Sequence, residues 1–117
     1  MLNKQNRLTK RKEFAFLYKN GKRVYGTSLN LVYFTTKLNH VRFGFVVSKK
    51  VGKAYVRNKI KRQLREIVRA NIDKFSTKCN YIYVAKPEIV GKEYKQIETE
   101  VLTLLNKIPS TQKEVLK

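Results

Sequence analysis

Residues 48–65 read SKKVGKAYVRNKIKRQLR, with eight lysine or arginine side chains and no acidic one. Val56, Ile60 and Leu64 recur in this stretch at intervals of four, which is the spacing of one face of an α-helix. The cations must then lie on the rest of the helix surface. The stretch predicts a helix from about Ala54 to Ile72 that buries one side in a core and offers the other to a polyanion.

A helical wheel at about 100° per residue divides this helix further. Ile67 extends the apolar stripe, and Arg57 falls on its flank. Lys59 lies away from the main basic side, and Lys53 occupies the N-cap position without an acceptor to offer. The side opposite the stripe carries Asn58, Lys61, Arg62, Arg65 and Arg69.

Charge is unevenly divided along the chain. Residues 1–65 hold 18 lysines and arginines against one acid, Glu13, whereas residues 66–117 hold 9 against 7, which together give the net charge of +19. Such an imbalance would be strongly self-repelling without a polyanionic partner. The first half of the chain is therefore expected to carry the binding surface.

That partner could be nucleic acid or an anionic membrane. No run approaches the roughly 18 apolar residues of a membrane span, and the apolar stripe of the basic helix is better used as core than as a lipid-facing surface. The N-terminus has no signal-type apolar segment, and a lone Cys79 fits a reducing compartment. We expect a cytoplasmic protein without a membrane partner.

The rest of the chain predicts one α+β domain over residues 1–117, with loose ends at 1–8 and 110–117. A first helix is capped by Thr9 and ends near Lys19, with Asn20 and Gly21 as a left-handed stop. Alternating or β-rich runs predict strands near 24–25 and at 29–36, 41–48 and 81–85, with a short hairpin at 37–40 and a closing helix at 94–108. The expected order is α-β-β-β-α-β-α, a sandwich of helices on a small, mainly antiparallel sheet.

Aromatic side chains give a second signal. Phe14 and Tyr18 share a face of the first helix, and either Tyr33 or Phe34 follows on a strand. These rings could be core, or they could line a cleft in which unpaired bases stack. The pattern alone does not separate the two readings.

Protein-borne catalysis is not expected. Asp73 is the one aspartate, and His40, the one histidine, falls in the predicted hairpin. Cys79 lacks a second cysteine for a metal site, and the glycines do not form a phosphate loop. We predict neither catalytic nor metal-binding residues in this chain.

The motifs resemble a known family. RNKIKRQLRE at 57–66, preceded by VRFGFVVSKKVGKAYV at 41–56, is similar to the signature block of the bacterial ribonuclease P protein subunit. The similarity is nearly continuous from Arg42 to Glu66. It extends more weakly through NRLTKRKEFAFLYKNGKRV at 6–24 and YVAKP at 83–87.

This resemblance implies a ribosomal protein S5 domain 2-like fold with a left-handed βαβ crossover, against the usual right-handed rule. It also implies that a catalytic RNA subunit, with Mg²⁺ held by that RNA and the substrate, removes the 5′ leader of precursor tRNA. The leader would lie on Phe14, Tyr18 and, as the choice over Phe34, Tyr33. No protein partner is implied, and the RNA subunit would be bound by Lys49, Lys50, Lys53, Arg57, Asn58, Lys59, Lys61, Arg62 and Arg65.

One departure concerns the second arginine of the family's Arg-Asn-Arg motif, which is Lys59 here. Lysine keeps the positive charge but lacks the planar guanidinium group with its paired donors, so a simple charge contact is expected there. Three other functions compete: a structural RNA-binding module such as a ribosomal protein, a nuclease acting alone, and a membrane-surface protein.

Overall fold

The computed structural model describes residues 3–36 and 41–109, so the predicted hairpin with His40 and the tail at 110–117 lie outside the described residues. The elements follow the predicted order α-β-β-β-α-β-α. They are α1 (Arg11–Asn20), β1 (Lys22–Tyr25), β2 (Leu29–Thr35), β3 (Arg42–Val47), α2 (Ala54–Ala70), β4 (Cys79–Ala85) and α3 (Tyr94–Asn106), with 3-10 turns η1 (Lys4–Asn6), η2 (Ile72–Lys74) and η3 (Pro87–Ile89).

The four strands form one sheet in the order β1-β2-β4-β3. β2 pairs antiparallel with both β1 and β4, whereas β3 and β4 are parallel neighbours connected through α2. A parallel pair needs such a crossover, because a hairpin can join only antiparallel strands. The sheet is therefore mainly antiparallel, and its one parallel pair carries the basic helix.

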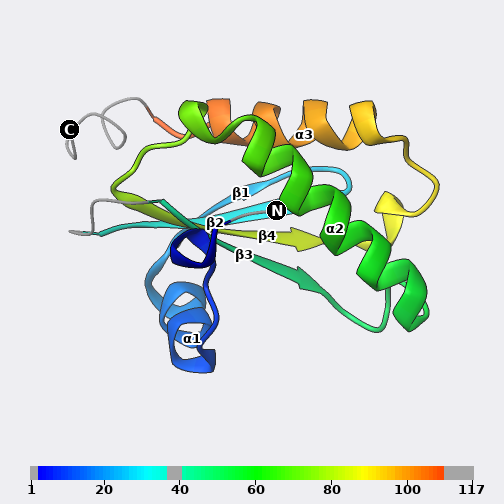
Figure 1. The fold of residues 1–117 in the computed structure, drawn as a ribbon, viewed down its shortest axis with the longest axis horizontal. Helices are drawn as coiled ribbons and strands as arrows, with labels where there is room; N and C mark the ends of the chain where they lie inside the picture. The colour runs from blue at the N-terminus through cyan, green and yellow to red at the C-terminus, as the bar shows by residue number, and fades with distance from the viewer. Residues whose placement is uncertain (1–2, 37–40, 110–117) are drawn as a thin grey trace.

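The helices lie on both faces of the sheet. α2 and α3 cover one face, and α1 covers part of the other (Figure 1). The central strand β4 shows why: Tyr81 and Tyr83 point into the core beneath α2 and α3, while Ile82 between them joins the smaller core beneath α1. Alternate residues of a strand point to opposite faces, and here both faces are packed.

The apolar stripe of α2 faces the larger core. Ile60, Leu64 and Ile67 are buried, and Val68 extends the stripe. The helix ends at Ala70, because the Asn71 side chain donates hydrogen bonds to the Ile67 carbonyl oxygen (2.8 Å) and to Oε2 of Glu98 (2.9 Å). The predicted end at Ile72 was two residues too long.

One expectation near the N-terminus needs correction. Gly21 follows α1 with φ −75°, so the stop is not left-handed. A glycine is required there because a Cβ would lie 2.6 Å from the Leu17 carbonyl oxygen. Within residues 3–8, Asn6 donates a hydrogen bond to the Val41 carbonyl oxygen (2.6 Å), and Leu8 is buried in the smaller core.

Among the described residues, no helix is long and apolar enough to cross a membrane. The basic helix α2 lies on one face of the sheet and α1 on the other (Figure 1).

Glu100 of α3 ties that helix to the turn between β1 and β2. Its carboxylate accepts hydrogen bonds from the backbone N–H groups of Ser28 (2.8 Å) and Leu29 (2.9 Å), and from the hydroxyls of Ser28 and Thr27. Partial burial opposes ionisation, but these hydrogen bonds prevail and lower the pKa of Glu100.

Replacing Glu100 by Gln should lower the free energy of unfolding by about 1–3 kcal/mol, because buried donors lose a charged acceptor. A lowered carboxyl pKa stabilises the fold above the unfolded value of about 4.3 and loses this effect as the pH falls through the folded value. Urea unfolding at pH 7 and across the acid range measures both effects. The exposed Glu88→Gln is the matched control, and an equal, small change in both variants would contradict the assignment.

Candidate nucleic-acid interface

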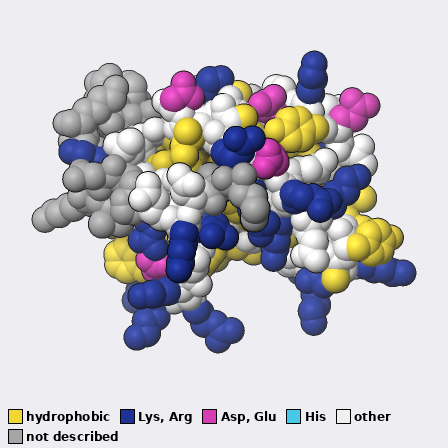
Figure 2. All heavy atoms as spheres, in the orientation of Figure 1, with side chains coloured by type: hydrophobic (Ala, Val, Ile, Leu, Met, Phe, Trp, Pro, Cys, Tyr) yellow, Lys and Arg dark blue, Asp and Glu magenta, His cyan; other side chains and the backbone are white. Residues whose placement is uncertain are grey.

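The basic surface of α2 is the outer side of a buried helix. Lys61 and Arg65 are half-buried and one turn apart, about 6 Å along the axis, while Asn58 and Arg62 are exposed. We call these four residues the basic face. Lys and Arg side chains spread over α2 and α1, whereas the acidic side chains lie mainly toward the edge formed by α3 (Figure 2).

The cations of the basic face are not neutralised by the protein. Arg69 pairs with Glu66 at 3.0 Å, but within residues 3–36 and 41–109 Lys61, Arg62 and Arg65 form no ion pair. Arg57 directs its Nε to the Gly52 carbonyl oxygen (3.1 Å), which holds its guanidinium at the start of the helix. The face is therefore available to an external polyanion.

The loop before α2 adds three exposed cations. Its conformation is fixed by Val51, which is buried in the core and donates a backbone hydrogen bond to the Ser48 carbonyl oxygen (3.0 Å). The loop and helix thus present together the predicted RNA-binding residues outside the basic face: Lys49, Lys50, Lys53, Arg57 and Lys59.

Phe14 and Tyr18 lie on one side of α1, both half-buried at the edge of the smaller core. The Phe14 ring rests directly on β3: a Cβ at Gly44 would approach its Cε1 and Cζ to 2.6 Å. The guanidinium of Arg23 lies 5.8 Å from the centre of the Tyr18 ring, and its Nη2 donates to the Tyr18 carbonyl oxygen (2.8 Å). Partial burial raises the pKa of the Tyr18 hydroxyl.

Tyr33, the sequence-based choice for the strand aromatic, and Phe34 lie on opposite faces of the sheet. Tyr33 is only 4% exposed and belongs to the larger core under α2 and α3. Phe34 points to the α1 side, where it is half-buried and meets Phe16 edge to face at 5.1 Å. Phe34 is therefore the strand aromatic that shares a face of the sheet with Phe14 and Tyr18.

The two predicted surfaces meet at the β3 edge of the sheet. A pocket of 220 Å³ there receives Phe14 from α1 and Lys61 and Arg65 from α2, although these helices lie on opposite faces. The strand supplies the floor, and the N-terminal segment closes one side. The remaining lining residues are Arg7, Leu8, Thr9, Phe43, Gly44 and Phe45. Tyr18 and Phe34 do not line this pocket.

Arg7 and Thr9 were missed by the sequence reasoning. Arg7 forms a parallel bridge with Phe43, and the Leu8 N–H donates to the Phe43 carbonyl oxygen (2.8 Å). The Nε of Arg7 is buried and has no hydrogen-bond partner among the residues that the structure describes. The positive charge of Arg7 was the one sign in the sequence that it could bind an anion. Its pairing with Phe43, which brings it to the same pocket as Lys61, could not be predicted from the sequence.

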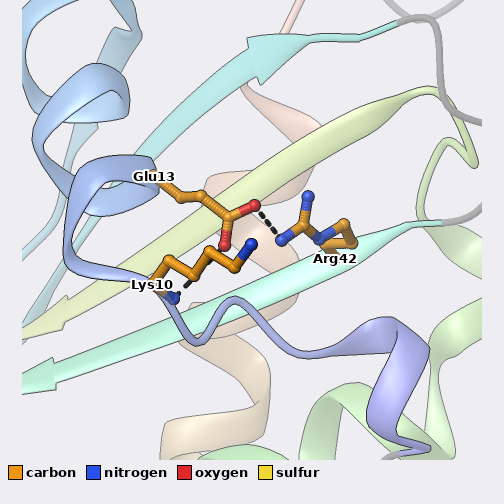
Figure 3. A network of polar contacts seen from close by, with 3 residues as sticks. All are labelled: Lys10, Glu13 and Arg42. Atoms are coloured by element: carbon orange, nitrogen blue, oxygen red, sulfur yellow. Dashed lines mark hydrogen bonds and ion pairs between the residues drawn. The ribbon is translucent and has the colours of Figure 1, made fainter.

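An ion pair fixes α1 over this edge. The Glu13 carboxylate accepts hydrogen bonds from Nη2 of Arg42 on β3 and from the Lys10 backbone N–H (Figure 3). Burial opposes ionisation of Glu13, but the hydrogen bond and charge of Arg42 outweigh it and lower the pKa. The one acidic residue of the first 65 thus has a positioning role.

The described site combines cations with an aromatic ring. In the part of the chain that the structure describes, no three His, Cys, Asp or Glu side chains gather as metal ligands would. Cys79 is buried, and burial raises the pKa of its thiol. Unpaired cations beside an aromatic ring can hold phosphates and stack bases.

Comparisons with known proteins agree with this geometry. The sequence matches the family described as Ribonuclease P over residues 2–109. It is 41% identical over 106 residues to the ribonuclease P protein component of Clostridium botulinum strain 657, covering 89% of this chain and 95% of the relative. It is 43% identical over 101 residues to that of Fusobacterium nucleatum, covering 82% and 90%.

Solved structures show the same fold. The RNase P protein of Staphylococcus aureus superposes with a TM-score of 0.80 at 29% identity, covering 86% of this chain and 93% of that one. The RNase P protein of Thermotoga maritima gives a TM-score of 0.81 at 27% identity, covering 88% and 97%. The predicted α+β fold class is confirmed.

The contact between Gly44 and Phe14 predicts an energetic coupling. Gly44→Ala should destabilise the protein by about 1–3 kcal/mol, because the new methyl group displaces the ring. In a Phe14→Ala background the ring is gone, so the same substitution should cost much less. A double-mutant cycle by urea unfolding measures the difference; additive effects would show that the two positions do not act through this contact.

Proposed function

The chain belongs to the ribonuclease P protein family, and on that basis we propose that it is the protein subunit of a ribonucleoprotein endoribonuclease. In this proposal a catalytic RNA subunit cleaves precursor tRNA to release the 5′ leader, in the cytoplasm. The protein supplies binding and no catalytic group. The observation that carries the proposal is the row of unpaired cations on α2 that shares a pocket with Phe14.

The RNA subunit would bind the basic face and the loop before it. Lys61, Arg62 and Arg65 lie along one side of a rigid helix and can contact successive phosphates, with affinity that comes from counterion release. Asn58 can donate to or accept from a ribose 2′-hydroxyl, which distinguishes RNA from DNA. The packed stripe beneath the helix holds these groups in place before binding.

The single-stranded leader would follow the α1 side of the sheet. Phe14, Tyr18 and Phe34 are half-buried, so each ring is held by the core yet keeps an accessible part. Rings of this kind stack unpaired bases with little regard for sequence. Phe14 lies in the pocket with Lys61 and Arg65. The leader on the α1 side would therefore lie next to the RNA subunit on α2.

The catalytic Mg²⁺ belongs to the RNA and the substrate in this proposal. The described residues offer no cluster of carboxylates that suits the ion. Protein cations can replace part of the screening that the ions otherwise provide, which lowers the magnesium requirement. The cleaved product lacks the leader contacts and binds less tightly, which promotes turnover.

A structural RNA-binding module would share the basic face but would not need a leader surface. The two functions differ in what the rings on the α1 side do, which only the test of Tyr18 below separates.

Arg62→Ala should weaken binding to the catalytic RNA and flatten the slope of log Kd against log salt by about one, because one phosphate contact is lost. Arg69→Ala is the matched control, since Arg69 is an exposed arginine of the same helix already paired with Glu66. An unchanged slope for Arg62→Ala would remove this residue from the phosphate contacts.

Tyr18→Ala should reduce the preference of the holoenzyme for precursor over mature tRNA by about tenfold, the effect of losing one stacked base. Tyr18→Phe keeps the ring and should keep the preference. Equilibrium binding of both tRNAs, with melting temperatures of each variant, makes the test. A lower melting temperature with an unchanged preference would show that the ring is core only.

A further inference from the structure

A second aromatic surface lies on the side of α2 that faces α3. Of the large hydrophobic side chains exposed in the described part of the chain, three gather here: Tyr55 (73% exposed), Val90 (51%) and Tyr94 (38%). They come from the first turn of α2, the end of η3 and the start of α3. Exposed rings drawn together from separate elements indicate a contact surface.

These side chains line a groove of 520 Å³, larger than the pocket at the β3 edge. One wall is α2, with Tyr55, Val56, Lys59, Ile60 and Gln63, and the other is the segment 89–94. Gly91, with φ +88°, turns the chain at the rim, and nothing lies within 4 Å of where its Cβ would be. The groove is therefore open at that point.

Lys59 belongs to this groove, in agreement with the helical wheel that placed it away from the basic face. Lys92 stands on the opposite wall beside Glu93, so two amines and one carboxylate line the groove. Gln63 adds a side chain that can both donate and accept hydrogen bonds. Amines beside exposed rings suit a ligand that has both a flat apolar part and a negative charge.

We propose that this groove binds an unpaired nucleotide of the catalytic RNA, with its base stacked on Tyr55 and its phosphate near Lys59 and Lys92. The inference rests on the proposed function and extends it: the RNA would contact both flanks of α2 rather than the basic face alone. In this arrangement Lys59 serves as a point charge for a phosphate, a role that does not need the planar fork of arginine.

Charge and continuity favour RNA as the occupant. Lys59 follows Asn58 directly, so a strand on the basic face can reach the groove across the exposed side of the same helix. A base-paired segment would hide its ring faces, whereas an unpaired base exposes them to a tyrosine. The lining carries two lysines against one glutamate, a net positive charge.

The test is binding of the full-length protein to the catalytic RNA for wild type, Tyr55→Ala and Tyr55→Phe. Tyr55→Ala should weaken binding about tenfold without changing the slope of log Kd against log salt, because stacking releases no counterions. Tyr55→Phe should restore the affinity. Tyr25→Ala, another exposed tyrosine, on the β1 edge, is the matched control and should bind as wild type does.

Acylation of ribose 2′-hydroxyls in the bound RNA locates the nucleotide. One unpaired position should be protected by the wild type and by Tyr55→Phe but not by Tyr55→Ala. Wild-type affinity and protection in Tyr55→Ala would overturn the inference, and so would an effect confined to precursor tRNA. Failure of the wild-type protein to bind the catalytic RNA would instead overturn the proposed function.

Discussion

The burial of one side of α2 is the constraint on which the rest of the molecule depends. Ile60, Leu64 and Ile67 are almost fully removed from water, and each such side chain contributes about 1.5–3 kcal/mol. With these residues inside, the helix cannot rotate, and its cations can only face outward or along its flanks. The core therefore sets the direction of every charged side chain on α2.

The same constraint explains how a chain of net charge +19 can fold. Both faces of the central strand β4 are packed, with Tyr81 and Tyr83 on one side and Ile82 on the other. Of the acidic groups, Glu13 holds α1 to β3 and Glu100 holds α3 to the β1–β2 turn. They stabilise the scaffold and, among the described residues, leave the basic face uncompensated. In the proposed function, bound RNA would relieve the repulsion among those cations.

Periodicity predicted the elements because it reports local burial. The stripe of α2 and the alternation in β3 gave their positions to within two residues. Tyr33 and Phe34 show the limit of prediction from alternation. Alternation indicates that neighbouring residues of a strand point to opposite faces. Because helices cover both faces of this sheet, the pattern could not tell which of the two rings belongs to the larger core. The larger core takes Tyr33, and the partly covered α1 side takes Phe34.

Features that depend on contacts between residues far apart in the sequence could not be predicted. Residues 3–7 are polar by composition, and only the contacts of Asn6 with Val41 and of Arg7 with Phe43 show that the segment lies against the β3 edge. Nothing in the sequence indicated that the Phe14 ring lies on Gly44. The groove between α2 and α3 depends on how two helices and η3 pack, although the wheel already separated Lys59 from the basic face.

In the proposed function this protein binds RNA and a catalytic RNA subunit cuts the precursor. Cleavage of a 5′-labelled precursor tRNA at low Mg²⁺ tests this division of roles, with the protein alone, the cognate catalytic RNA alone, and both together. Leader release is expected only in the combined mixture. Cleavage by the protein alone, or no gain on combining the two, would contradict it.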